Sequence, residues 1–573
     1  MSNRLTNLIA IILLTIIFIL SFFGMKGDSL TMDELAHIPA GYSYLTKADF
    51  RLNPEHPPLI KDLSAIPLLF LKINFPENHS SWKEGVNNQW WFGNQFLFHS
   101  GNDPDKIIFF SRISMILILI LLGWLIFKFA RELGGNFVGL TALTLFSFCP
   151  TFLAHGRLVT TDIGASLGVI LTTYFWLKFL KNPSFKNIIF SGLTLGVALL
   201  SKFSLALLIP FFIIITFIFV LLKETDKYSA AFKFIGKGLI IAIIALLLIG
   251  VVYQFHILNY PPEKQIEDTK IILESSPSGF LKNLCLFMAD KPGLRPFAHY
   301  LLGLLMVTQR AAGGNTVYFL GEISASGWWY YFPVVYFLKV PLAFHILTLI
   351  VLIFAIKAIK KDWLKNHFIE FSMLLFLAIY WFISIKGNLN IGIRHILPTF
   401  PFTYILVSLG IKKWLESISF KRFAFALVLV LLGWYIFSSL STFPHYLTYF
   451  NEIAGGSKNG YKFVVDSNYD WGQDLKRLNN WLKKNNVSKI YLDYFGGADA
   501  PYYLREKYLP WQGDKSENEL EKGSYLAVSA DLLQVGKGKP VKGFNQPTGY
   551  YNWLNQYTPI ARAGNSIFIY YIP

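Results

Sequence analysis

Long apolar runs alternate with short polar segments from the N-terminus to about residue 443. Several of these runs contain about 18 residues or more, the length at which an α-helix crosses a hydrocarbon layer about 30 Å thick. The pattern predicts about eleven membrane spans. They lie near residues 5–23, 107–127, 137–153, 160–177, 188–201, 203–222, 236–257, 332–356, 368–385, 394–411 and 423–443.

Two long connections interrupt the spans, and a different pattern follows the last span. The loop at residues 24–106 is too long for a plain connector, and the loop at residues 258–331 could cover a site. From residue 444 onward, tyrosine, asparagine, glycine and charged residues replace the apolar runs, and this part is long enough for a small domain. We therefore predict a transmembrane domain over residues 1–443 and a C-terminal domain over residues 444–573.

The C-terminal domain is predicted to mix helix and strand. Residues 475–484 have the spacing of an amphipathic helix, and residues 489–495, 525–529 and 567–572 have the composition of strands. An α/β arrangement follows. The segment VDSNYDWGQDL places aspartates at 466, 470 and 474, and turn and N-cap chemistry at the start of the helix is one explanation for them.

The composition supports a membrane protein and weakens a nucleic-acid hypothesis. Of 573 residues, 53% are hydrophobic and only 15% are charged. The net charge of +17 invites a nucleic-acid partner, but the lysines gather at the ends of apolar runs. Alternate connections are basic, and by the positive-inside rule they are cytoplasmic. They lie at residues 128–131, 178–186, 223–237, 357–365 and 412–422.

This charge bias predicts the orientation of a multi-pass protein of the plasma (inner) membrane. The N-terminus is expected inside. The two long loops, the turn at residues 154–159 and the C-terminal domain are expected on the extracytoplasmic side.

The stretch of residues 31–62 gathers ionisable side chains just after the first span. Asp33, Glu34 and His37 lie within five residues. Such groups are costly to desolvate at a membrane face, so they point to a function. If residues 32–44 form a helix, Asp33 and His37 share a face, and Glu34 points about a third of a turn away.

A second polar cluster follows in the segment NPEHPPL. Its prolines exclude a helix, so we expect a stiff extended segment. This segment could bring Glu55 and His56 to the same site as Asp33. The alternative is a polar loop with incidental charges.

Together these residues resemble a known family. Asp33-Glu34 after the first span, followed by His56-Pro57-Pro58-Leu59-Ile60-Lys61, resembles the lipid-carrier-dependent GT-C glycosyltransferases. These family 39-like enzymes include the protein O-mannosyltransferases and the lipid A aminoarabinose transferases. The mannosyltransferase pattern usually has glycine where Ile60 stands, so the resemblance is to the wider superfamily, over roughly residues 1–440. The segment around Asp466 also resembles one found in bacterial members.

The resemblance implies a GT-C fold and an activity. A sugar would pass from a polyprenyl-phosphate donor to a hydroxyl group of a glycan, lipid or protein, with inversion. Such attack needs a base for the hydroxyl proton and cations for the departing phosphate. We predict Asp33 as the base and Glu34 as the alternate. The predicted substrate-binding residues are His37, Glu55, His56, Lys61, Arg112, Lys202, Arg394 and His395.

Several of these positions have two interpretations. Asp162 resembles the second acidic position of the superfamily, where it could hold a metal together with His56, but it could equally cap a helix. Lys202 resembles a lysine that contacts the carrier phosphate, and the alternative for Lys202 and Arg112 is a snorkelling side chain. Arg394 suits phosphate because its planar fork donates two parallel hydrogen bonds. The resemblance allows a divalent metal ion but does not imply one.

A transporter is the main alternative, and a scaffold built on the C-terminal domain is a third hypothesis. A transporter predicts ionisable residues near the middle of the membrane and broken helices in matching halves. Here the charged residues gather on one long outer loop, and no repeat is evident. A scaffold leaves both polar clusters unexplained.

Overall fold

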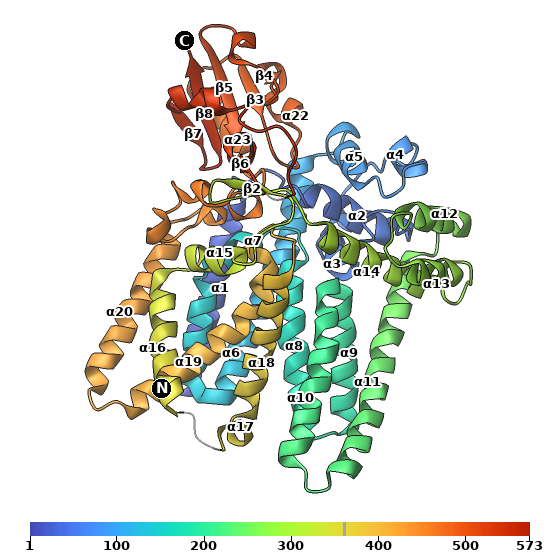
Figure 1. Cartoon of the computed structure of the whole chain (residues 1–573), viewed down its shortest axis with the longest axis vertical. Coiled ribbons are helices and arrows are strands. Elements are labelled where there is room, and N and C mark those ends of the chain that lie inside the picture. Colours follow the sequence, from blue (N-terminus) through green and yellow to red (C-terminus); the bar gives the residue numbers. More distant parts are fainter. Residues whose placement is uncertain (359–361, 542) are drawn as a thin grey trace.

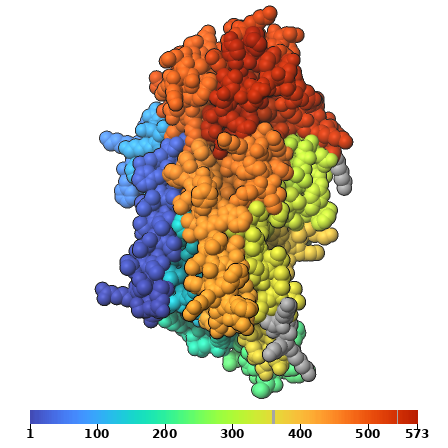
Figure 2. All heavy atoms as spheres, turned by 90° about the vertical axis from the view of Figure 1, so that its left-hand side faces the viewer, coloured from blue at the N-terminus to red at the C-terminus, as the bar shows by residue number. Residues whose placement is uncertain are grey.

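A computed structural model describes residues 1–358, 362–541 and 543–573. Long helices form the lower part of the molecule, and the C-terminal domain sits on their upper end (Figure 1). The N-terminus lies at the lower end and the C-terminus at the upper end. The side view of Figure 2 shows the same division, with the C-terminal domain in red above the helices. Of the basic connections, residues 359–361 lie outside the described residues.

Within the described residues, seven helices are long and apolar enough to cross a membrane. An eighth candidate is a pair of helices, α15 (Tyr331–Lys339) and α16 (Leu342–Ala358), which are bent by 112°. The seven are α1 (Asn3–Met25), α6 (Pro104–Ser147), α8 (Asp162–Lys181), α10 (Leu208–Lys223) with its leading turn η3 (Phe203–Leu207), α11 (Lys227–His256), α18 (Phe368–Lys386) and α20 (Lys421–Leu440).

The count of seven or eight differs from the predicted eleven, although the remaining predicted spans are also helical. Helix α6 counts once but contains two predicted spans, because the chain reverses at Gly135, where φ is +80°. A Cβ atom on Gly123 would lie 2.8 Å from the ring of Phe146, so the two arms of α6 lie side by side. The other two are α9 (Phe185–Ser201), which is short, and α19 (Phe400–Ser417), which carries charged residues near its end.

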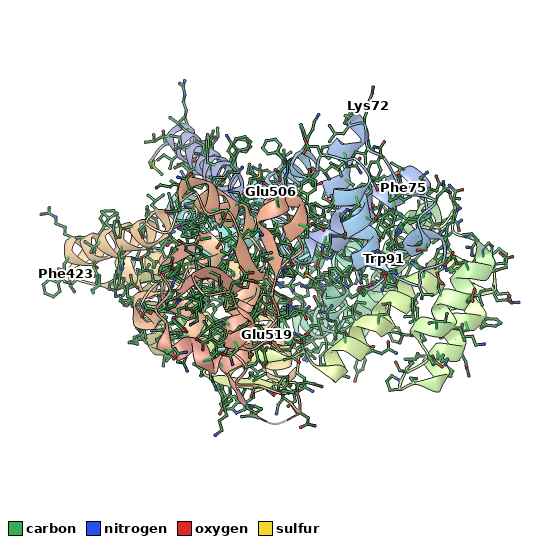
Figure 3. The ribbon with its side chains drawn as sticks, turned by 90° about the horizontal axis from the view of Figure 1, so that it is seen from above. Lys72, Phe75, Trp91, Phe423, Glu506 and Glu519 are labelled. Atoms are coloured by element: carbon green, nitrogen blue, oxygen red, sulfur yellow. The ribbon has the colours of Figure 1, made fainter. Side chains whose placement is uncertain are left out.

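The first long loop folds into several short helices rather than one long one. They are α2 (Glu34–Lys47), α3 (Leu59–Ala65), η1 (Ile66–Phe70), α4 (Ser80–Lys83), α5 (Gln89–Asn94) and η2 (Gln95–His99). Seen from above, this loop, with Lys72, Phe75 and Trp91, lies beside the C-terminal domain, which carries Glu506 and Glu519 (Figure 3).

The second long loop joins the helices to the C-terminal domain. It contains α12 (Pro262–Ile272), α13 (Gly279–Ala289), α14 (Arg295–Gly313), β1 (Val317–Phe319) and β2 (Glu322–Ser324). Strand β2 pairs in parallel with β6 (Lys539–Pro540) of the C-terminal domain.

The C-terminal domain is a small α/β unit, as predicted. Its five-stranded sheet has the order β4-β3-β5-β8-β7. The central strand β5 pairs in parallel with β3 and antiparallel with β8, with Ser524 opposite Ile572. The predicted helix at 475–484 and the predicted strand at 567–572 are both confirmed. The elements are α21 (Leu475–Lys484), β3 (Ile490–Asp493), α22 (Ala500–Leu504), β4 (Tyr508–Pro510), β5 (Ser524–Ser529), α23 (Ala530–Lys537), β7 (Ala561–Ala563) and β8 (Ile567–Ile572).

Buried charges fasten the C-terminal domain to the helices. Asp28, which follows α1, lies 2.8 Å from Arg157, in the turn between α7 (Pro150–His155) and α8, and 2.8 Å from Arg477 of α21. All three side chains are largely buried. Removing one partner of such a network leaves a charge unpaired in a dry environment, which is strongly destabilising. The network therefore fixes the position of the C-terminal domain over the upper end of the bundle.

Candidate active site

A cavity of about 240 Å³ lies where the first loop, η3, α14, α18 and the turn η4 (Ile393–Thr399) meet. One part of its lining is charged or ionisable, and the other is apolar. The first set is Asp33, Glu55, His56, Lys202, Arg310, Arg394 and His395. The second set includes Phe203, Leu207, Val307, Phe332, Ile383 and Leu389.

Asp33 and Arg394 form an ion pair at this cavity. Arg394 Nη1 lies 2.7 Å from an oxygen of Asp33 and 3.5 Å from an oxygen of Asp162. Lys202 continues the row of charges, because its Nζ lies 2.5 Å from the other oxygen of Asp162. Two acids and two cations therefore alternate at one end of the cavity.

Of these two acids, Asp33 is the one that a substrate can reach. Its side chain is 21% exposed, whereas that of Asp162 is 1% exposed. Asp33 precedes the first turn of α2 but caps no backbone amide with its side chain, so its carboxylate is available to the cavity.

Glu34, the predicted alternate base, is turned away from the cavity. Its carboxylate is fully buried and accepts hydrogen bonds from Arg112 Nε (2.8 Å) and Nη2 (2.6 Å), from Thr31 N and Oγ1, and from Val159 N. Burial by itself would raise the pKa of Glu34, but the charge and hydrogen bonds of Arg112 outweigh it, so that the pKa is lowered. This arrangement favours a structural role for Glu34 and gives no support to the prediction of an alternate base at this position.

Arg112 is the structural partner of Glu34. Besides the carboxylate, its guanidinium donates to the carbonyl oxygens of Asp28 (3.3 Å) and Ser29 (2.8 Å). The side chain is 1% exposed and does not line the cavity. Its contacts lie inside the fold, and the substrate-binding role predicted for Arg112 draws no support from this position.

Lys61 and His37 lie behind the cavity wall. Lys61 Nζ is fully buried and donates to Tyr44 Oη, to the side-chain and backbone oxygens of Asn53 and to the carbonyl of His56. His37 Nδ1 donates to the carbonyl of Val159 at 2.8 Å, and its ring meets that of His56 edge-on, with 5.1 Å between centroids. Both residues therefore hold the segment that carries His56 and do not line the cavity themselves.

The proline-rich segment turns at Pro54 and Glu55 instead of running extended as predicted, and this turn brings Glu55 and His56 to the cavity that Asp33 also lines. Glu55 accepts hydrogen bonds from Gln89 (2.5 Å) and Asn87 (3.2 Å). Burial, together with nearby positive charges, lowers the pKa of His56 well below its usual value, so this ring is uncharged at neutral pH.

A metal site is not supported by the arrangement of these groups. Across residues 1–358, 362–541 and 543–573, no three His, Cys, Asp or Glu side chains gather in a way that could hold a metal ion. The Asp162 carboxylate is instead taken up by Lys202 and Arg394. The metal role of Asp162 and His56 stays a prediction, and the described residues do not support it.

The sequence predicted Lys202, Arg394 and His395 as substrate-binding residues, and the structure places all three at the cavity. It adds Arg310 of α14, which has no ion-pair partner in the described part of the chain. In the sequence, the one feature that could have pointed to Arg310 is its place close to the glycine pair at the end of α14.

A family model described as dolichyl-phosphate-mannose-protein mannosyltransferase matches residues 93–252. No curated protein matches the chain. The apo Archaeoglobus fulgidus oligosaccharyltransferase aligns at 12% identity with a TM-score of 0.51, over 89% of this chain and 64% of that one. The S. cerevisiae protein O-mannosyltransferase Pmt1-Pmt2 complex bound to the sugar donor aligns at 12% identity with a TM-score of 0.54, over 78% of this chain and 90% of that one.

This chain has the GT-C fold. The partial family match and this fold agree with the predicted resemblance to the GT-C enzymes. The GT-C chain described here spans less than two thirds of the length of the archaeal oligosaccharyltransferase. ArnT from Cupriavidus metallidurans bound to undecaprenyl phosphate aligns at 10% identity with a TM-score of 0.44, over 98% of this chain and 97% of that one.

Proposed function

We propose that this glycosyltransferase moves a sugar from a polyprenyl-phosphate donor to a hydroxyl group of a glycan, lipid or protein, with inversion, on the extracytoplasmic side of the plasma membrane. The observation that carries the proposal is the division of the cavity into a charged end and an apolar wall. A polyprenyl-phosphate sugar has the same division, since a charged headgroup is attached to a long hydrocarbon chain.

The charged end has donors to spare for a phosphate. Lys202 Nζ carries three N–H groups and has one partner, Asp162. Arg394 uses Nη1 and Nε, and in the described part of the chain no hydrogen bond to its Nη2 is found. Arg310 adds a third positive charge. Lys202, Arg310 and Arg394 would therefore hold the phosphate, with donors set in place before the reaction begins.

The reaction would be a direct displacement at the anomeric carbon. The acceptor oxygen forms a bond to that carbon while the bond to the phosphate oxygen breaks, and the electron pair stays on the phosphate. Asp33 takes the proton of the hydroxyl group, which contributes about 10²–10⁴-fold to a rate. Lys202 and Arg394 stabilise the negative charge that develops on the departing phosphate.

Glu55 and His56 would orient the sugar. Glu55 is held in place by Gln89 and Asn87, and the uncharged ring of His56 offers a hydrogen-bonding group. Neither residue needs to change its protonation state in this mechanism.

The test is a donor screen with the purified protein in detergent. Several polyprenyl-phosphate sugars are offered with pooled hydroxyl acceptors, and release of polyprenyl phosphate and the anomeric configuration of the product are measured. We expect acceptor-dependent release and an inverted product, with the rate of release lowered about 10²–10⁴-fold in Asp33→Asn. Transfer from nucleotide sugars alone, or a product with retained configuration, would refute the proposal.

A further inference from the structure

The segment of residues 466–474 reaches from the C-terminal domain to Arg394. The guanidinium carbon of Arg394 lies 4.3 Å from the centre of the Trp471 ring. On another side, Ser467 Oγ accepts a hydrogen bond of 3.2 Å from Arg394 Nε. Both Trp471 and Ser467 are buried. The C-terminal domain therefore supplies an aromatic face and a hydrogen-bond acceptor to a cation at the cavity.

This segment also holds the chain that carries Asp33. The backbone N–H of Met32 donates to the carbonyl of Trp471 at 3.1 Å, and that of Ser29 donates to the carbonyl of Gln473 at 2.8 Å. Both members of the ion pair between Asp33 and Arg394 are thus held by the same nine residues.

The segment is itself anchored at several points. Asn468 Oδ1 accepts from the backbone N–H of Ile393, next to Arg394, at 2.9 Å. The buried Lys339 donates to the carbonyl of Asn468 at 2.6 Å. Asp470 accepts from the backbone N–H of Asp531 at 3.1 Å. These contacts join the segment to α15, to the turn η4 and to α23, so it is a fixed platform rather than a loose loop.

A glycine permits this close approach. Gly392, two residues before Arg394, has φ of +142°, and a Cβ atom there would lie 2.2 Å from Ser467 Oγ. Only glycine combines this backbone conformation with such close contact.

We infer that Ser467 and Trp471 are positioning residues for the transfer reaction, and that the C-terminal domain completes the active site by holding Arg394 in register with Asp33. The inference that this affects the rate rests on the proposed function. An arginine side chain has many rotamers, and confining its planar head between a ring and an acceptor selects one of them. A small misplacement of such a group costs much of the rate.

The first test replaces the platform without changing charge. Trp471→Leu removes the aromatic face, and Trp471→Phe keeps a smaller one. Trp553→Leu is the control, since Trp553 is a partly buried tryptophan of the same domain whose ring contacts Tyr557. We expect Trp471→Leu to lower kcat by about 3- to 30-fold. We also expect a smaller change in the KM of the acceptor, substantial recovery in Trp471→Phe and no effect of Trp553→Leu.

A double-mutant cycle separates positioning from general damage. If Trp471 acts through Arg394, Trp471→Leu should change the rate by less than about 2-fold when Arg394 is already lysine. Full additivity of Trp471→Leu and Arg394→Lys would overturn the inference. Should Trp471→Leu fail to fold, Ser467→Ala provides the same cycle with a smaller change in volume.

A second readout does not depend on sugar transfer. Phenylglyoxal modifies accessible arginines, and mass spectrometry reports the rate at Arg394, which is 8% exposed in the intact platform. We expect faster modification of Arg394 in Trp471→Leu and in Gly392→Ala, and an unchanged rate in Trp553→Leu. If Arg394 is modified faster in these variants but the wild-type protein transfers no sugar from lipid-linked donors, the proposed function is refuted and the positioning role of the platform is retained. Unchanged modification together with unchanged kcat would refute the platform.

Discussion

Neutralising two neighbouring acids, Asp33 and Glu34, should affect two different properties of the protein. Glu34→Gln should damage folding, whereas Asp33→Asn should damage turnover. The structural reason is that Glu34 is fully buried against Arg112, while Asp33 is 21% exposed at the cavity and pairs with Arg394.

The size of the Glu34 effect follows from its contacts. Both oxygens of the Glu34 carboxylate accept hydrogen bonds. There are five in all, and two of them come from Arg112. A glutamine amide can accept at only one end, so its NH₂ group would face donors, and the buried Arg112 would lose its opposite charge. Breaking a buried ion pair in this way costs about 3–5 kcal/mol.

The substitution Asp33→Asn should change the stability little and the rate of transfer strongly. Asp33→Asn keeps an acceptor for Arg394, which also keeps Asp162 at 3.5 Å, so the free energy of unfolding should change by only about 1 kcal/mol. The loss of a general base should lower the rate about 10²–10⁴-fold, which corresponds to about 3–5 kcal/mol of barrier.

The assay pairs thermal unfolding in detergent with single-turnover transfer at saturating donor. Wild type, Asp33→Asn and Glu34→Gln are compared, and the yield of monodisperse protein is recorded for each. Glu34→Gln should show a lower Tm and a low yield, and Asp33→Asn a near-normal Tm and a large loss of rate. A Glu34→Gln protein that melts like wild type but transfers no sugar would show that Glu34 performs the chemistry and would refute the assignment.

Three further predictions concern the phosphate, the orientation and the pH dependence. Lys202→Ala should weaken donor binding by about 10- to 100-fold with little change in acceptor KM; equal donor affinity would leave Lys202 only as the ion-pair partner of Asp162. Cysteines placed at the exposed Lys72 and Glu519 should react with an impermeant maleimide in intact cells, and reaction only after permeabilisation would contradict an extracytoplasmic site. Burial raises the pKa of Asp470 to about 7, whereas an unfolded aspartate titrates near pH 4. The folded state therefore holds a proton that the unfolded state has released, and the free energy of unfolding should fall as the pH rises from about 4 to 7. Asp470→Asn should flatten that slope in a Tm series, and an unchanged slope would remove Asp470 as its cause.

The sequence by itself determined the elements. Apolar runs long enough to cross a membrane became helices because a backbone in hydrocarbon must satisfy its own hydrogen bonds. The change of composition at residue 444 marked the C-terminal part, and helix α21 was predicted with both its ends. The concentration of acids after the first span also pointed to the first loop as part of the site.

Only the tertiary structure decided which charged residue faces the cavity. Asp33 and Glu34 are adjacent in sequence, but they diverge where α2 begins, so one meets the cavity and the other meets Arg112. Arg112 and Lys61 looked like ligands because their type and position fitted, yet their donors are used by partners inside the fold. Periodicity reports how apolar each face of an element is, and it does not report which polar partner will lie opposite.

The same limit explains the most distant contacts. Asp33 and Arg394 pair across 361 positions, and Trp471 reaches Arg394 from another domain. No local pattern encodes such a meeting, because it depends on how the helices, the turn η4 and the C-terminal domain pack together. In the sequence alone, the segment VDSNYDWGQDL could be explained by turn and N-cap chemistry. Its contact with Arg394 depends on the position of the C-terminal domain over the bundle, which the buried charges of Asp28, Arg157 and Arg477 fix.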